Sequence, residues 1–389
     1  MNQNSFIKSE VWFLIGALHG GGAEKQCFLQ AKSLAEKGIC TTIFLLSPPK
    51  KLNSIHEKLK IITLCDLSKG NKALKVFKIL KSIFSIRKKL AKKSSNVIFY
   101  AWLEIPHFIS FCSTVFSKAK LVWAIRNSNS GAHRQYWKMN LAVNINAFFS
   151  RYVDLFIANS HCGMEFYKKR KRYNIKLGKV LNNTIDFLTY TSIDSNQKKT
   201  LLQKHKLAEE YFIIVTVSRI TPIKNIEMMI NAIFYISQLK QKKIKWLHAG
   251  LGEKHYVSAL KAMIDNYKLN EYIEFIGETD EVNEYMQLSD LFILSSLSEG
   301  SSNSLLEAIA CKTLCISTNV GDSSRFLDSQ TILSSMSSED LAKKISWALS
   351  LPENEREFLI AKAYERVYAL CNSKKNITQL IGFFSELSS

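Results

Sequence analysis

The chain has 389 residues, enough for two domains, and its 47% hydrophobic and 22% charged residues are typical of a globular rather than a disordered protein. Residues 1–186 hold 31 Lys+Arg against 9 Asp+Glu and the remainder 22 against 24, so the net charge of +20 comes entirely from the first half. We expect such a half to attract a polyanion: nucleic acid, an anionic membrane surface or a phosphorylated lipid.

No apolar run reaches the length of about 18 residues that a transmembrane helix needs, so none is expected. The first residues lack the basic region and the small-residue cleavage site of a signal peptide. The eight cysteines are scattered, and Cys311 and Cys315 form a lone C-x-x-x-C without a second pair. This pattern favours reduced, buried thiols over a zinc site.

The first elements predict a Rossmann-like unit. An apolar strand, a glycine turn, a helix and a second strand follow one another over residues 10–16, 19–24, 23–37 and 39–46. Gly21 and Gly22 in the turn would let the backbone approach a ligand closely, although such turns also serve tight packing. Further strands are predicted over 96–101, 120–125 and 153–158.

Residues 69–93 hold ten basic residues and no acid, and they predict a basic amphipathic helix. Its apolar positions recur at helical spacing: Val76, Ile79, Leu80, Ile83, Phe84 and Leu90. One interpretation is a core helix with a solvated basic face; the other is a basic face resting on anionic lipid headgroups. A second basic cluster, KKRKR at 168–172, lies in the same half and could equally be a solvated loop.

Polar residues follow the strand predicted over 120–125, at the carboxyl edge where ligands of such sheets bind. Arg126, Asn127 and His133 are therefore candidates for the substrate cleft on the acceptor side, with surface groups as the alternative.

The first alternation of strands and helices ends near Asp186, and a polar stretch over 187–209 is interpreted as a linker. Strands and helices then alternate again up to a strand over 313–318, and the tail is helical from about Glu353. The alternation predicts an α/β fold of two doubly wound, Rossmann-like domains facing each other across a cleft. The expected parts are two domains over 1–188 and 189–365 and a helical tail over 366–389.

The stretch 290–307, DLFILSSLSEGSSNSLLE, predicts a buried strand, a polar turn and the start of a helix. Free backbone N–H groups at that helix N-terminus would attract phosphate; the residues there are Gly300, Ser301, Ser302 and Asn303. Glu299 and Glu307 flank them and could accept hydrogen bonds from hydroxyl groups, so the stretch suits a nucleotide-sugar. Taken singly, Glu299 could be a solvated turn residue and Glu307 an ordinary helix acid.

Two further turns are expected at the same edge. Arg219 directly follows a strand over 211–218 and Lys224 precedes the next helix, so the pair could clamp a diphosphate. Gly250 and Gly252 form another glycine turn. A surface pair and a packing turn are the alternatives. Because the sequence has no D-x-D pair of the metal-holding kind, basic groups and helix N-termini would have to neutralise a leaving group.

These motifs resemble a known family. S-R-x4-K (218–224), A-G-x-G (249–252) and E-G-x6-E (299–307) are similar to the retaining family-4 glycosyltransferases of GT-B fold, as are G-G-A-E near the start and N-N-x-I-D at 182–186. The W-x-I-R-N-S stretch at 123–128 resembles bacterial members that build surface glycans on a lipid carrier.

The resemblance implies a role for each matching position. Arg219 and Lys224 would stabilise the nucleoside-diphosphate leaving group, Glu299 would bind hydroxyls of the donor sugar and Glu307 those of the ribose. Gly21 and Gly22 would lie near the donor phosphate from the opposite domain. The resemblance also implies that 1–188 is the acceptor-binding domain and 189–365 the nucleotide-sugar-binding domain, and that the last helix packs back on the first domain. Family members retain anomeric configuration and need no metal or cofactor. Arg126, or else His133, takes the place where many members have a histidine. Further departures at Ser301, Lys312, Asp322 and Arg325 leave the donor sugar open.

The sequence therefore predicts a retaining glycosyltransferase. It would move a hexose or N-acetylhexosamine from a nucleotide donor, UDP-linked by expectation, to a lipid-linked or lipopolysaccharide acceptor. We expect it to be cytoplasmic, peripheral on the inner face of the plasma membrane and bound to its anionic surface. The alternatives are a sugar-nucleotide epimerase of the same fold and a non-catalytic nucleotide-sugar or polyanion-binding protein. No nucleic-acid-binding motif occurs.

Overall fold

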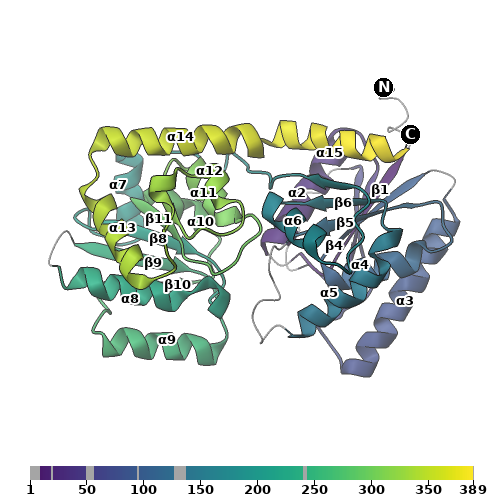
Figure 1. Cartoon of the computed structure of the whole chain (residues 1–389), viewed down its shortest axis with the longest axis horizontal. Helices are drawn as coiled ribbons and strands as arrows, with labels where there is room; N and C mark the ends of the chain where they lie inside the picture. Colours follow the sequence, from purple (N-terminus) through teal and green to yellow (C-terminus); the bar gives the residue numbers. More distant parts are fainter. Residues whose placement is uncertain are drawn as a thin grey trace. The chain divides into compact units, whose positions relative to one another are not determined.

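The computed structural model describes residues 9–18, 21–49, 57–93, 96–126, 137–239 and 243–388. The chain divides into two compact units (Figure 1). Unit 1 runs to Thr184 and takes in the residues from Ser373 onward, and unit 2 is Ile185–Asn372. The division thus falls at 184/185 and 372/373, a few residues from the predicted 188/189 and 365/366. Unit 2 extends to Asn372 rather than to residue 365 because Val367 and Cys371 are buried in its core.

Within the described residues, unit 1 has a seven-stranded parallel sheet in the order β3-β2-β1-β4-β5-β6-β7. Its strands are β1 (Glu10–Ile15), β2 (Thr41–Leu45), β3 (Leu59–Thr63), β4 (Val97–Trp102), β5 (Lys120–Ile125), β6 (Leu155–Ala158) and β7 (Gly178–Val180). Its helices are α2 (Gly22–Glu36), α3 (Lys72–Ala91), α4 (Glu104–Thr114), α5 (Trp137–Phe149), η2 (Ser150–Tyr152), α6 (His161–Lys169) and α15 (Ser373–Ser388).

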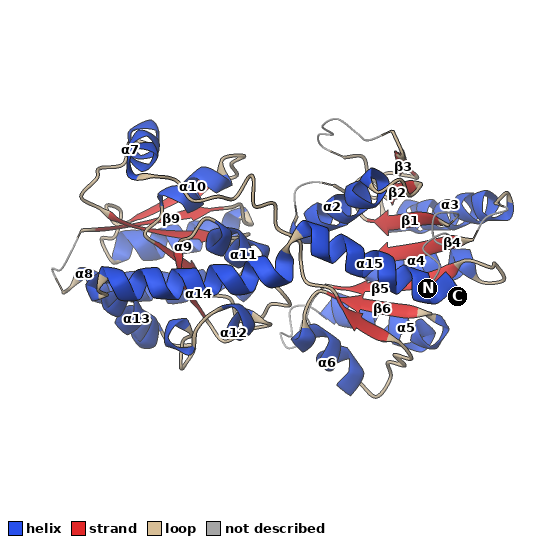
Figure 2. Cartoon of the chain, turned by 90° about the horizontal axis from the view of Figure 1, so that it is seen from above, coloured by secondary structure: helices blue, strands red, loops and turns tan. Residues whose placement is uncertain are grey.

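Alternate side chains of β1 enter two different cores, as expected for a strand covered on both faces. Phe13 and its neighbours pack with α2 and with Leu380 and Phe384 of α15. Trp12 and Leu14 point to the other face, where α3, α4, α5 and α6 contribute apolar residues. Figure 2 shows the sheet, in red, between helices on both sides.

Unit 2 has a five-stranded parallel sheet in its described part, in the order β10-β9-β8-β11-β12. The strands are β8 (Phe212–Val217), β9 (Ile244–Ala249), β10 (Ile273–Gly277), β11 (Leu291–Leu294) and β12 (Leu314–Ser317). The helices are α7 (Ser195–Lys204), η3 (Pro222–Lys224), α8 (Ile226–Ser237), α9 (Lys254–Asn266), α10 (Val282–Leu288), α11 (Asn303–Ala310), α12 (Ser323–Phe326), η4 (Ser329–Thr331), α13 (Ser338–Ser350) and α14 (Glu353–Cys371).

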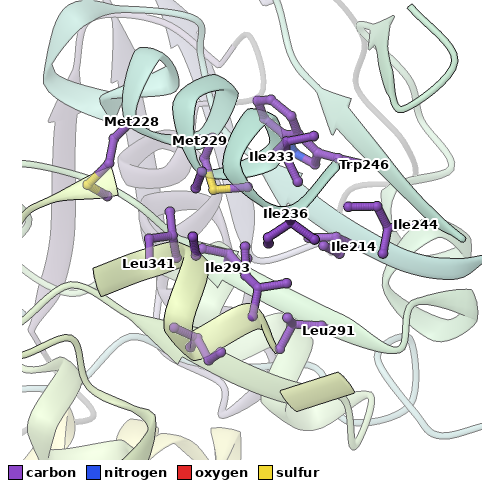
Figure 3. Packing of buried hydrophobic residues seen from close by; sticks show 14 of the residues in the cluster. Ile214, Met228, Met229, Ile233, Ile236, Ile244, Trp246, Leu291, Ile293 and Leu341 are labelled. Atoms are coloured by element: carbon purple, nitrogen blue, oxygen red, sulfur yellow. The ribbon is translucent and has the colours of Figure 1, made fainter. Parts of the chain in front are cut away.

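Helix α8 lies on one face of this sheet with α13 beside it. Figure 3 shows Ile233 and Ile236 of α8 packed against Trp246 of β9 and Ile214 of β8, with Leu341 of α13 nearby. Helices α10, α11 and α14 cover the opposite face. The fold class is therefore the one expected: two α/β units, each with a parallel sheet flanked by helices.

Some elements differ from the sequence-based expectation. The stretch 187–209 is not a plain linker, because α7 lies within it and begins with a capping box between Asp194 and Gln197. Helix α7 has weak apolar periodicity and buries only Leu202, which explains why the pattern did not reveal it. Strands β3 and β7 were also not predicted; none of the residues of β7 is fully buried.

Helix α3 differs from the expected amphipathic pattern in which side is buried. Its buried residues are Ser82, Ile86 and Leu90. Of the apolar positions expected to form one face, Val76, Leu80 and Phe84 are exposed. Helix α3 thus presents apolar as well as basic side chains to solvent.

None of the helices in the described ranges is both long and apolar enough to cross a membrane. The eight cysteines are free thiols, but their burial is mixed, since Cys40 and Cys162 are exposed.

The last helix gives a direct test of the unit boundary. Phe384 is fully buried against Tyr100. Phe384→Ala should lower the free energy of unfolding of unit 1 by about 3–5 kcal/mol because it leaves a cavity. Urea unfolding followed by tryptophan fluorescence measures this. The exposed Phe358 is the matched control, and Phe358→Ala should cost less than about 1 kcal/mol. Equal effects would contradict the assignment of α15 to the core.

Candidate functional site

The candidate side chains of unit 2 come from turns at one edge of its sheet. Because β10, β9, β8 and β11 are consecutive and parallel, the turns that follow them lie in that order along the carboxyl edge. These turns contain Gly277, then Gly250 and Gly252, then Arg219 and Lys224, then Glu299. Four stretches far apart in sequence are therefore neighbours at the edge where α/β sheets bind ligands.

The glycines after β9 allow two turns to approach each other closely. A Cβ at Gly250, whose φ is +147°, would lie 1.8 Å from the carbonyl oxygen of Ser218. A Cβ at Gly252 would lie 2.5 Å from the carbonyl oxygen of Ile220, whose N–H donates to Leu251 O at 2.7 Å. Only glycines therefore let the turn after β9 pack this closely against the backbone on either side of the exposed Arg219.

Lys224 and Glu299 form an ion pair. The Lys224 ammonium contacts Glu299 Oε1, and their side chains are 21% and 15% exposed. Ser296 Oγ donates to the same carboxylate oxygen at 2.8 Å. The backbone is also fixed, because Ser295 Oγ donates to Lys224 O at 2.8 Å and Leu297 N donates to Ile223 O at 2.8 Å. The turns after β8 and β11 are thereby joined, with the ammonium at their junction.

The turn after Glu299 leads into α11. Ser302 is its N-cap and accepts a hydrogen bond from Leu305 N at 3.4 Å, so Asn303 is the first helical residue. Gly321 has φ +55°, and a Cβ there would lie 2.2 Å from Gly300 O. Asp322 N donates to the same oxygen at 3.1 Å. The loop after β12 therefore packs against, and donates a hydrogen bond to, the turn that precedes α11.

Glu307 is buried, with 6% of its surface exposed, one turn into α11. Burial, and to a smaller extent the charge of Glu307, raises the pKa of the Cys311 thiol to about 12. Glu307 therefore lies on the buried side of α11 and not on a solvated face.

A buried histidine that the sequence did not single out fixes the Arg219 turn. Thr216 Oγ1 accepts a hydrogen bond from Trp246 Nε1 at 2.9 Å, so its own hydroxyl proton is directed to His248 Nδ1 at 2.7 Å. His248 Nε2 then carries a proton and donates to Ser218 O at 3.1 Å. Burial lowers the pKa of His248 to about 4, which keeps the ring neutral. His248 is thus a positioning residue for the backbone before Arg219.

In unit 1, Arg126 is a partly buried cation directly after β5. Its guanidinium lies 3.6 Å from the ring centre of Trp102 and donates to Asn183 Oδ1 at 3.2 Å and to Tyr100 OH at 3.4 Å. Burial lowers its pKa. Within the described ranges these hydrogen bonds go to neutral groups, and Nε has no partner. A desolvated guanidinium with spare donors is suited to an anion.

Gly21 and Gly22 lie at the start of α2. Gly21 is the N-cap, and its N–H donates to Glu24 Oε2 at 3.2 Å. Helix α2 is tied to the N-N-x-I-D segment, since Gln26 exchanges hydrogen bonds of 2.8 and 2.7 Å with the Thr184 backbone. Asn127 and His133 lie outside the described residues.

The described residues contain one group with the composition of a metal site, His205, Glu281 and Glu284. Lys204 already contacts both glutamates, at 2.9 and 2.7 Å. This group lies where α7 meets α10, and Glu281 belongs to the turn between β10 and α10.

Comparison with known proteins identifies the second half. Residues 197–366 match the family model "Glycosyl transferases group 1". Unit 2 is a group 1 glycosyltransferase domain.

Similar proteins extend over most of the chain. A Campylobacter jejuni α-1,4-N-acetyl-D-galactosaminyltransferase, named for an undecaprenol-diphosphate-linked glycan, is 21% identical over 92% of this chain and 93% of its own length. The Bacillus anthracis N-acetyl-α-D-glucosaminyl L-malate synthase is 29% identical, but the alignment spans only 36% of this chain and 35% of that enzyme.

Solved structures share the fold. Anabaena HepE, solved with UDP and glucose, superposes with a TM-score of 0.79 at 17% identity and covers 97% of this chain and 99% of its own. WaaG, a glycosyltransferase of lipopolysaccharide biosynthesis, gives a TM-score of 0.73 at 13% identity, with 94% and 98% covered. This chain therefore has the GT-B type of fold predicted from its motifs.

The His248 network makes stability depend on pH. The folded pKa of about 4 lies below the ordinary value of 6.5, so the unfolded chain binds more protons between these values. Stability from this group is present above pH 6.5 and is lost as the pH falls toward 4. His248→Gln should reduce the slope of unfolding free energy against pH in this window by up to about 1.4 kcal/mol per unit.

Urea unfolding at several pH values checks this expectation. His255 is the matched control, because its side chain is 80% exposed in the same unit. His255→Gln should leave the slope unchanged. A slope in His248→Gln equal to that of the wild type would show that His248 is not held neutral.

Proposed function

We propose that the chain is a retaining glycosyltransferase that moves a hexose or N-acetylhexosamine from a UDP-linked donor to a lipid-linked glycan or lipopolysaccharide acceptor. The observation that carries the proposal is the Lys224–Glu299 pair at the start of α11, beside the exposed Arg219. This arrangement combines cations, helix N–H groups and a carboxylate at one sheet edge, which are the groups needed for a diphosphate next to a sugar hydroxyl.

Arg219, Lys224 and the N-terminus of α11 bind the diphosphate in this proposal. The ammonium of Lys224 has further N–H donors beyond the one that contacts Glu299, so it can bridge the carboxylate and a phosphate oxygen. Glu299 accepts hydrogen bonds from the donor sugar, and the buried Glu307 accepts them from the ribose. Arg219, Lys224 and the N–H groups of α11 neutralise the charge of the diphosphate, without a metal ion or cofactor.

The acceptor hydroxyl attacks the anomeric carbon from the side on which the leaving group departs. The bond between that carbon and the phosphate oxygen breaks, and the hydroxyl proton passes to a phosphate oxygen of the departing nucleoside diphosphate. The configuration of the sugar is therefore retained. The cations are most useful here, because negative charge develops on the leaving phosphate in the transition state.

The acceptor side is proposed for unit 1. Arg126 offers a partly buried guanidinium, whose Nε lacks a hydrogen-bond partner, to an anionic group. Relatives named for undecaprenol-diphosphate-linked glycans support an acceptor on a lipid carrier. Such an acceptor requires a position on the cytoplasmic side of the membrane, where nucleotide-sugars are available, and the basic first half suits its anionic surface.

Turnover of a panel of nucleotide-sugars, with and without lipid-linked acceptor, tests the proposal. Glu307→Gln should lower kcat/KM for the UDP-sugar by about 10- to 100-fold, mainly through KM, because a charged hydrogen-bond acceptor for the ribose is lost. Glu307→Ala should lose more. Glu357→Ala, at an exposed glutamate of α14, is the control and should keep wild-type values.

Full activity in Glu307→Ala would contradict the site. A sugar product that forms at the same rate without acceptor and differs from the donor sugar in configuration would identify an epimerase instead.

A further inference from the structure

Helix α3 carries a row of large apolar side chains on its outer side. Phe77, Leu80 and Phe84 are each more than half exposed, with Phe84 at 74%. Their spacing of three and four residues places them on one face of the helix. The buried Ile86 lies on the opposite face, packed against the sheet of unit 1. The row therefore points away from the core.

Helix α5 repeats this arrangement. Leu141, Ile145 and Phe148 are exposed at spacings of four and three, and Tyr152 continues the row in η2. Val143 is buried in the same cluster as Ile86. Both rows lie on the side of their helices that faces away from the sheet.

The two rows belong to one helical layer. Helix α4 lies between α3 and α5 and packs against both, and all three cover the same face of the sheet (Figure 1). Just after α4, Phe116 is 99% exposed and has φ +66°. A bulky side chain in the left-handed region costs free energy, and a fully exposed ring recovers none of it by packing. We call the outer side of α3 and α5, with Phe116, the docking face.

The surroundings of the docking face are basic. Helix α3 has seven Lys and Arg residues and no acid, and Lys81, Arg87 and Lys88 are exposed beside the apolar row. Next to Phe148 is a surface hollow of about 850 Å³. No carboxylate is among its lining residues, and its cations are Arg151, Lys168, Lys171 and Arg172.

We propose that the docking face binds an anionic lipid bilayer: Phe77, Leu80, Phe84, Phe116 and Phe148 insert at the boundary between headgroups and acyl chains while the flanking Lys and Arg contact lipid phosphates. This rests on the proposed function, whose acceptor is lipid-linked, and it adds that apolar insertion as well as charge holds the enzyme at the membrane.

Charge and side-chain type favour this occupant over others. A second copy of the chain would bring an equally basic face, and like charges would repel. A single-stranded nucleic acid would use aromatic stacking and charge but would leave the aliphatic Leu80, Leu141 and Ile145 unused. An anionic bilayer is complementary to both the cations and the aliphatic side chains.

Vesicle sedimentation tests the proposal, with phosphatidylcholine alone and with phosphatidylcholine mixed with phosphatidylglycerol. The wild type should bind the mixed vesicles more tightly than the neutral ones. The triple variant Phe77→Ser/Leu80→Ser/Phe84→Ser should bind mixed vesicles at least about tenfold more weakly, because full burial of even one large apolar side chain contributes about a factor of ten. Lys81→Glu/Lys88→Glu should lose the preference for phosphatidylglycerol.

Matched controls lie on unit 2, at the exposed Phe358 and Lys261. Phe358→Ser and Lys261→Glu should bind like the wild type. The single variant Phe84→Ser, at the most exposed residue of the row, checks the result if the triple variant unfolds.

Unchanged binding in these face variants, or equal binding of the wild type to both vesicles, would overturn the proposal. Self-association that the triple variant abolishes, without vesicle binding, would overturn it in favour of a dimer face.

Nucleotide-sugar hydrolysis in solution, measured on the same preparations, keeps this result separate from the proposed function. The triple variant should hydrolyse the donor at the wild-type rate. Loss of vesicle binding with donor turnover intact is the expected outcome for that variant. A wild type that binds vesicles but turns over no nucleotide-sugar would leave the docking face standing and would contradict the glycosyltransferase proposal.

Discussion

Parallel pairing of β8 with both β9 and β11 is the constraint on which the candidate site depends. It brings the turns after these strands to one edge, and local contacts then fix each turn. His248 and Gly250 hold the backbone at Ser218, and Lys224 joins the β8 turn to Glu299. Buried groups that cannot move without losing hydrogen bonds thus position an exposed arginine and a half-buried ammonium. The site is preorganised by its backbone, and its cations remain accessible to a ligand.

The strands of both sheets were largely predictable, because buried parallel strands form short apolar runs; β5 begins and ends at the predicted residues, 120 and 125. Helix α7 could not be predicted from the sequence, since a single buried leucine gives no apolar periodicity. The site turns could be placed at one edge from the alternation of strands and helices. The role of His248 could not be predicted, because a lone histidine in an apolar strand does not reveal its hydrogen-bond partners. For α3, apolar residues occur around most of the helix, so the pattern did not indicate which side would be buried.

The two units divide their chemical tasks in this account. Unit 2 is close to electrically neutral and carries the groups proposed for the donor, whereas the excess positive charge belongs to the half of the chain that forms most of unit 1. There the charge accompanies exposed aromatic and aliphatic side chains on α3 and α5. A protein that needed the charge only for solubility would not also expose Phe77, Phe84 and Phe116, which cost solvation free energy. Arg126 is different, because it is partly buried and lies against Trp102 and Tyr100 rather than on the exposed helical layer.

The central claim is that Arg219 and Lys224 bind a nucleoside diphosphate without a metal. Calorimetric titration with UDP and with GDP in EDTA, on the wild type and on Arg219→Ala/Lys224→Ala, tests it most directly. The account predicts that UDP binds the wild type in EDTA and that the double variant binds it about a hundredfold or more weakly, because two charged contacts are lost. Equal binding by both proteins, or no binding of either nucleotide to the wild type, would contradict the claim.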